Sequence, residues 1–210
     1  MMPYEYEKDG QKIYQKSFAT IRSESSLEHF TEEEEVIAVR MIHASGMVKL
    51  AKQIQFSKTF AISARSALLL GAPILCDSRM VAEGITKSRL PAGNKIICTL
   101  NEAGVLELAR KLRNTRSAAA LEYWRPHLSG AIVAIGNAPT ALFHLLNILE
   151  EPNSPKPAAI IGCPVGFVGA MESKEALWQA CPSPCCIVRG RLGGSAITVA
   201  AINALAGNYE

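Results

Sequence analysis

The chain has 210 residues, of which 49% are apolar and 20% charged, a composition typical of a globular protein that needs neither disulfide nor metal to fold. A formal net charge of +3 is too small to indicate nucleic-acid binding, although it mildly favours a small polyanionic ligand. No apolar run is long enough to span a membrane and residues 1–9 lack a signal-peptide core, so we expect a cytoplasmic protein.

The first part of the chain, residues 1–70, is predicted to be mainly helical. Apolar residues recur at helical spacing, and they predict helices over Gly10–Ser25, from Thr31 to about Ser45, and over Lys58–Leu70. The second helix should begin with a capping box, because Thr31 and Glu34 have the required spacing. Gly46 is its expected end.

From Pro73 onward, short apolar runs alternate with helical segments. Buried strands are predicted over Pro73–Cys76, Lys95–Leu100, Ala131–Gly136, Ala158–Gly162 and Cys185–Arg189. Helices are expected over Arg79–Gly84, Glu102–Trp124, Thr140–Glu150, Glu172–Ala180 and Ser195–Ala206. Apolar runs without alternation indicate a parallel sheet that is covered on both faces. We therefore predict an α/β fold with a doubly wound, flavodoxin-like, mainly parallel sheet of about five strands, helices on both faces and an N-terminal helical segment.

The proline-rich segment Glu151–Pro157 is too short for an interdomain linker and is predicted to be a surface loop. Residues 1–210 are accordingly expected to form a single domain, helical over 1–70 and alternating over 71–210. Six cysteines fit a reducing compartment. Those in or after predicted strands are Cys76, Cys98 and Cys163, and the others, predicted as small buried side chains and not as metal ligands, are Cys181, Cys185 and Cys186.

Glycine-bearing loops follow three of the predicted strands, at Gly136–Thr140, Gly162–Gly169 and Arg189–Ser195. Ligands of open α/β sheets bind beyond the carboxyl ends of the strands, and glycine lets the backbone approach them closely. The three loops together favour a cradle for a ligand with several carboxylates or phosphates, although each glycine could serve only a tight turn. Neither the dinucleotide-binding motif nor the P-loop motif occurs, so a nicotinamide or ATP enzyme is not expected.

Among the four histidines, His43 differs because Arg40 precedes it by three residues on the same helix face. A neighbouring cation disfavours protonation of an imidazole, and a bound polyanion favours it again, so His43 could act as a ligand-gated proton donor. These residues alone are equally compatible with catalysis and with packing. His144 lies among apolar residues and is expected to pack with its hydrogen bonds satisfied, whereas His29 and His127 are expected outside the core.

Several stretches resemble the precorrin-8X methylmutases, also called precorrin isomerases. They are Tyr14–Phe18, Arg40–Ala44, Gly71–Asp77, Asn114–Ala120, Ala134–Phe143, Gly166–Lys174 and Gly190–Ala196. The resemblance implies a flavodoxin-like homodimer with active sites near the subunit interface. It also implies an isomerase of cobalamin biosynthesis that moves a methyl group from C11 to C12 of the macrocycle, converting precorrin-8X to hydrogenobyrinate or cobalt-precorrin-8 to cobyrinate. Since the methyl group stays within the substrate, no cofactor, metal or external donor is expected.

By the same resemblance, His43 is the proton donor or acceptor of the rearrangement. The substrate-binding residues are then expected to be Ser17, Arg40, Thr86, Arg116, Asn137 and Gly166. Two other functions stay open at this point, a carrier that holds a tetrapyrrole without chemistry and a flavodoxin-like protein that binds flavin or a phosphate ligand. The residues do not distinguish a metal-free substrate from a cobalt-containing one.

Overall fold

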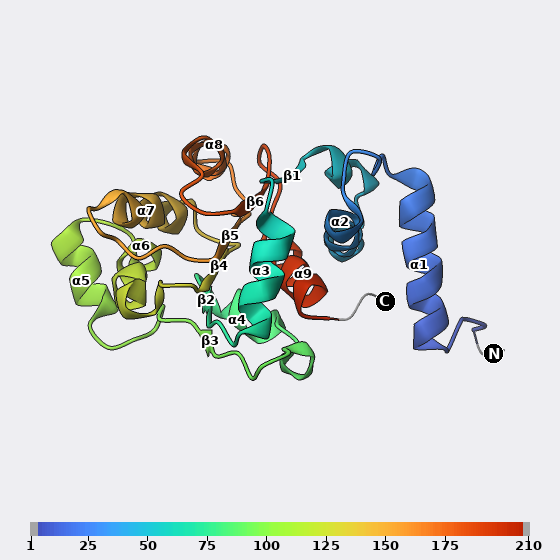
Figure 1. Cartoon of the computed structure of the whole chain (residues 1–210), viewed down its shortest axis with the longest axis horizontal. Coiled ribbons are helices and arrows are strands. Elements are labelled where there is room, and N and C mark those ends of the chain that lie inside the picture. The colour runs from blue at the N-terminus through green and yellow to red at the C-terminus, as the bar shows by residue number, and fades with distance from the viewer. Residues whose placement is uncertain (1–3, 208–210) are drawn as a thin grey trace.

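The computed structural model describes residues 4–207, which form a sheet with helices on both faces (Figure 1). The ends of the expected domain, residues 1–3 and 208–210, lie outside the described residues. The helices are α1 (Gly10–Glu24), α2 (Glu32–Ser45), α3 (Phe60–Leu69), α4 (Arg79–Gly84), α5 (Val105–Leu112), α6 (Arg116–Ala120), α7 (Pro139–Glu150), α8 (Ala170–Ala180) and α9 (Ser195–Ala206). Three 3₁₀ helices are η1 (Val48–Lys52), η2 (Lys87–Arg89) and η3 (Leu121–His127). The strands are β1 (Ile54–Phe56), β2 (Ile74–Cys76), β3 (Ile96–Ile97), β4 (Ile132–Ile135), β5 (Ala159–Gly162) and β6 (Cys185–Val188).

The sheet has the order β1-β6-β5-β4-β2-β3. Its five parallel strands, counted along the chain, lie in the order 2-1-3-4-5, which is the order of flavodoxin-like sheets. The predicted fold class is therefore confirmed. The sixth strand, β1, was not predicted. It runs antiparallel to β6, with Ile54 opposite Val188.

Both faces of the sheet are buried, which explains why its strands show no apolar–polar alternation. In β4, Ile132 and Ala134 join the core beneath one helix layer, while Val133 and Ile135 join the core on the other face. The first core is covered by α2, α3, α4 and α9, and the second by α7, α8 and η3. Helix α1 stands outside the first layer and packs on α2, at the outer end of the molecule in Figure 1.

One predicted helix, Glu102–Trp124, is wrong as a continuous element. Helix α5 ends at Leu112 because Arg113 adopts the left-handed conformation (φ 50°). Thr115 then accepts a hydrogen bond from the Ala118 N–H and so starts α6, and the chain continues as η3. The strand predicted over Lys95–Leu100 is also shorter, since only the two residues of β3 pair with β2.

The predicted bounds of the other helices and strands agree with the structure within about two residues, a usual margin for such boundaries.

Cys181 is exposed and Cys98 is half-buried, so the expectation of a buried thiol is wrong for Cys181. His144 is satisfied as expected, because its Nε2 lies 2.7 Å from a carboxylate oxygen of Glu122. Between residues 4 and 207, no helix is both long and apolar enough to cross a membrane.

Candidate active site

Helix α2 presents His43 and Arg40 one turn apart near its carboxyl end. The helix begins with the predicted capping box, in which the Thr31 hydroxyl accepts from the Glu34 N–H and the Glu34 carboxylate accepts from the Thr31 N–H. Gly46 ends it in the left-handed conformation (φ 66°). Because Arg40 and His43 are three residues apart, both side chains project from the same face.

Aromatic rings of α1 surround the imidazole. The ring centroids of Tyr14 and Phe18 lie 5.5 Å and 5.4 Å from that of His43, and the Phe18 ring meets the imidazole edge-on. The Arg40 guanidinium carbon lies 5.3 Å from the Phe18 centroid, within cation–π range. Phe18 is buried while His43 is exposed, so α1 fixes one side of an imidazole that still faces solvent.

Two adjoining cavities open around this cluster, and they share Tyr14, Arg40 and Arg89. The larger, about 470 Å³, lies between α1, α2 and η2 and is lined by Gln11, Tyr14, Gln15, Phe18, Ala19, Arg22, Arg40 and Arg89. The smaller, about 220 Å³, is lined by Tyr14, Arg40, His43, Ala44, Thr86, Arg89, Ala196, Val199, Ala200 and Asn203. Three arginines thus border the two adjoining cavities, which suits a ligand with several negative charges.

Helix α9 connects this space to the carboxyl edge of the sheet. Its first turn contributes Ala196 to the His43 cavity. The loop after β4 touches the same turn, since a Cβ built on Gly136 would lie 3.0 Å from the Ser195 Cα. The cavity therefore starts beside the carboxyl edge and extends along the helix layer, whereas the sequence predicted a site above the strand ends.

Asp77 occupies the place between β2 and β4 where the strand order reverses, the usual ligand position in such sheets. Its carboxylate accepts from the backbone N–H groups of Gly136, Asn137 and Ala138 at 3.0, 2.9 and 2.8 Å. Burial raises the pKa of this carboxyl, and the three N–H donors partly offset the rise. The Asp77 carboxylate is thus the anion that these three backbone N–H groups bind, so they need no anionic ligand.

The glycine-bearing loops pack closely on one another. Gly193 admits no side chain, because a Cβ there would lie 2.3 Å from the Cys163 carbonyl oxygen. The neighbouring Leu192 carbonyl accepts from the ammonium group of Lys174 at 2.5 Å. Lys174 is fully buried, and burial lowers its pKa to about 8. Part of the glycine pattern is thus explained by packing at the carboxyl edge.

The structure divides the predicted site residues into two groups. Arg40, His43 and Thr86 line one cavity, and Ser17 lies on α1 beside Phe18, half-buried and outside the cavity linings. Asn137 is exposed after β4, and the N–H of Gly166 donates to the Arg191 carbonyl oxygen. Arg116 begins α6, whose alanines pack in the layer across the sheet from α2. These last three residues do not line either cavity.

Sequence reasoning missed Arg22, Arg89 and Asn203, which also line the cavities. No local pattern marks them, because their meeting depends on how α1, η2 and α9 pack together. The only hint for Arg89 was that it follows Thr86, a predicted substrate-binding residue, by three positions. Asn203 lies within an apolar helix, where a polar side chain needs partners, and that isolation could have drawn attention to it.

Fold and strand order place the chain among the flavodoxin-like α/β proteins. The family model for precorrin-8X methylmutase matches residues 12–208. A precorrin-8X methylmutase of Sinorhizobium sp. is 58% identical over 98% of this chain and 98% of its own length. The cobalt-precorrin-8 methylmutase of Priestia megaterium is 37% identical over 93% of this chain and 86% of its own. The solved structure of precorrin-8x methyl mutase from Thermus thermophilus superposes with a TM-score of 0.85 at 37% identity, covering 94% of this chain and 95% of the other. The chain belongs to the precorrin-8X methylmutase family and is an isomerase of cobalamin biosynthesis.

Proposed function

We propose that this chain converts precorrin-8X to hydrogenobyrinate by moving a methyl group from C11 to C12 of the macrocycle. Family membership supports the reaction type. The metal-free substrate is favoured over the cobalt form because the relative named for it is the more similar of the two compared. The non-catalytic alternatives have no comparable support.

The observation that carries the proposal is the position of His43. Its imidazole borders a cavity that adjoins a larger one, and arginines line both. Precorrin-8X is a broad ring with several carboxylate arms, and a solvent-facing trough with guanidinium groups along it suits such a shape and charge. Packing against Tyr14 and Phe18 restrains the imidazole, and this preorganisation is what a proton donor needs.

The chemistry requires one proton and a fixed ring conformation. His43 donates a proton to the conjugated macrocycle, the methyl group migrates from C11 to C12 with its bonding electron pair, and the proton is returned. The net reaction is an isomerisation, so no oxidant, reductant or second substrate enters the balance. The remaining task is to hold the macrocycle in one orientation, and carboxylate contacts supply that restraint.

We assign substrate contacts to the residues expected from the sequence. Arg40 lines both cavities and is assigned to a carboxylate, and Thr86 lines the His43 cavity. Ser17 precedes Phe18, whose ring meets the imidazole, and is assigned to the same ligand. Asn137 and Gly166 would meet the part of the ligand that extends over the carboxyl edge. Arg116 lies on the other side of the sheet, so we propose that it reaches the ligand bound to a second copy of the chain.

We propose a homodimer with its sites near the interface, so that residues from two copies can meet one ligand. Light scattering measures this directly, and a strict monomer at micromolar concentration would contradict the dimer. We also propose that residues 1–210 form one domain, because the sheet carries both helix layers. A cytoplasmic location is proposed from the biosynthetic role of the family.

Replacing His43 tests the function. We expect His43→Ala to bind hydrogenobyrinate like the wild type and to convert precorrin-8X roughly 100- to 10,000-fold more slowly, the usual effect of a positioned acid–base group. His127→Ala is the matched control, since His127 is also exposed but belongs to η3 on the other side of the sheet. Unchanged turnover in His43→Ala would remove His43 from the mechanism. Binding without conversion by the wild type would favour a carrier.

A further inference from the structure

Arg89 lines both cavities, although the sequence singled out only its neighbour Thr86. It is the last residue of η2, the short turn that faces α1 and α2 across the cavities. We propose that the Arg89 guanidinium binds a carboxylate arm of the macrocycle and that Asn203 is the residue that positions it. The inference rests on the proposed function for the identity of the ligand, and it adds a specificity-determining contact to that site.

The partners of the three cavity arginines differ. Arg22 donates to the Glu35 carboxylate at 2.8 Å, and Arg40 lies over the Phe18 ring. The exposed Arg89 side chain has no hydrogen bond, ion pair or ring contact with any of residues 4–207. A guanidinium without an anion, at the edge of a cavity wide enough for a carboxylate, is the group most able to gain a new bidentate ion pair.

Asn203 braces the turn that carries Arg89. From α9, its Oδ1 accepts from the Thr86 N–H at 2.9 Å and its Nδ2 donates to the Gly84 carbonyl oxygen at 3.3 Å. The Arg89 N–H in turn donates to the Thr86 carbonyl oxygen at 2.9 Å. One amide side chain thus holds both ends of the segment between α4 and η2.

Close packing reinforces the brace. A Cβ built on Gly84 would lie 2.8 Å from Cγ2 of Val199, so α4 and α9 meet here without room for a side chain. Val199 and Asn203 project one turn apart from the same helix and both line the His43 cavity. The backbone that carries Arg89 is therefore fixed relative to α9, which lines the His43 cavity, and less conformational entropy is lost when Arg89 binds an anion.

Titration of hydrogenobyrinate, followed by its visible absorbance, tests the Arg89 contact without needing turnover. We expect Arg89→Ala to weaken binding about 10- to 100-fold, the usual effect of a charged hydrogen-bonded contact. Arg89→Lys should recover part of that loss, because it keeps the charge but not the paired N–H donors. Arg110→Ala is the matched control, an exposed arginine on α5 that loses the same charge and should bind as the wild type.

Asn203 is tested through a double-mutant cycle. Asn203→Leu should raise KM for precorrin-8X severalfold with kcat nearly unchanged, and it should add little to the loss already caused by Arg89→Ala. Asn203→Asp keeps the acceptor for the Thr86 N–H, so its KM should lie between those of the wild type and Asn203→Leu. It replaces the leucine variant if that variant fails to fold. Additive effects of the two substitutions would overturn the positioning role.

The outcomes separate this inference from the proposed function. If Arg89→Ala binds hydrogenobyrinate as tightly as the wild type while His43→Ala loses turnover, the Arg89 contact is overturned and the isomerase assignment stands. If the wild type binds hydrogenobyrinate through Arg89 but does not convert precorrin-8X, the contact stands and the isomerase assignment fails. A wild type that neither binds hydrogenobyrinate nor converts precorrin-8X overturns both.

Discussion

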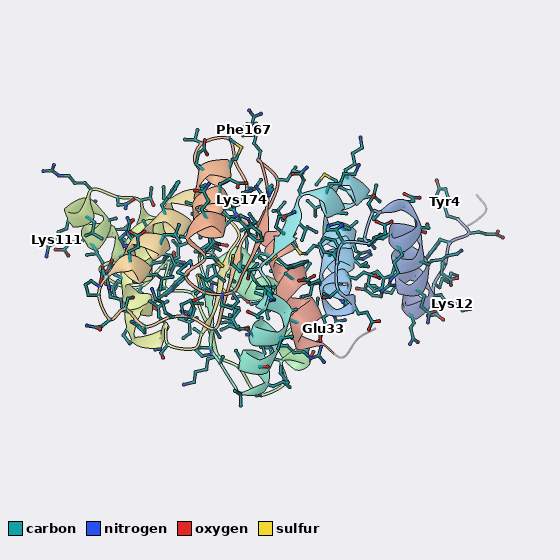
Figure 2. The ribbon with its side chains drawn as sticks, turned by 45° about the horizontal axis from the view of Figure 1, so that its top comes forward. Tyr4, Lys12, Glu33, Lys111, Phe167 and Lys174 are labelled. Carbon is teal, nitrogen blue, oxygen red and sulfur yellow. The ribbon has the colours of Figure 1, made fainter. Side chains whose placement is uncertain are left out.

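Lys174 shows how strongly single residues are constrained at the carboxyl edge of the sheet. Lys174 lies on α8 (Figure 2). Its side chain is buried, and its ammonium group donates to the Leu192 carbonyl, next to the glycine pair that precedes α9. Burying a cation that is held by one carbonyl is costly. Lys174 therefore couples the position of α8 to the loop that leads to Ala196 in the His43 cavity.

This burial predicts a pH dependence of stability. The folded protein releases the Lys174 proton near pH 8, whereas the unfolded chain holds it up to the ordinary value of 10.5. Between these values the unfolded state binds more protons, so the group's contribution to the free energy of unfolding rises with pH. We expect the wild type to gain on the order of 2 kcal/mol over Lys174→Met between pH 8 and 10.5, as measured by urea denaturation.

Lys111 provides the control for this measurement. It projects from the end of α5, far from Lys174 in Figure 2, and is exposed. The difference in unfolding free energy between the wild type and Lys111→Met should stay constant over the same pH range. A constant difference for Lys174→Met as well would show that the buried ammonium does not titrate early.

The relative position of two site residues was predictable where both lie on one helix. It was not predictable where distant segments of the chain bring them together. Arg40 and His43 were paired correctly because helical spacing alone places them on one face. Asp77 directly follows the predicted strand Pro73–Cys76, but its three N–H donors come from residues about 60 positions later, and only the sheet brings them together. Arg89 and Asn203 depend in the same way on contacts between distant elements.

At the scale of elements, α2 is the helix whose stability matters most to the site, since it carries His43. Thr31 caps its first turn, and removing such a cap costs about 1 kcal/mol. We expect Thr31→Ala to lower the free energy of unfolding by that amount in urea denaturation.

Thr59 is the matched control, because it holds the same position before α3 but its side chain makes no capping hydrogen bond. Thr59→Ala should change the unfolding free energy by a few tenths of a kcal/mol at most. Equal losses in the two variants would mean that the Thr31 cap does not contribute to α2.

The elements that sequence reasoning found best have signals at their own ends. Helix α2 has its capping box and Gly46, and α9 begins after a glycine pair. The failure at β1 lacks such a signal, because β1 has three residues and is a strand only because β6, about 130 positions later, pairs with it. The break at Arg113 did have one. Asn114 and Thr115 follow it, both are weak helix formers, and Thr115 caps α6.

At the scale of the whole molecule, the arrangement of layers determines where a ligand can lie. The doubly wound class of the sheet was predictable, because apolar strands that alternate with helices can form only a few sheet topologies. The site was predicted above the strand ends, yet the cavity beside His43 runs outward between α1, α2, η2 and α9. Helix α1 explains the difference, because it adds a further wall outside the usual two layers (Figure 1).

The central claim is that His43 exchanges a proton with a macrocycle held in these adjoining cavities. A crystal structure of the protein with hydrogenobyrinate tests it most directly. We predict that the imidazole lies about 3 Å from the ring edge near C11 and C12, or one water molecule away, with Arg40 and Arg89 on carboxylate arms. A macrocycle bound beyond the reach of His43, for example above Asp77 on the far side of the strand ends, would contradict the account.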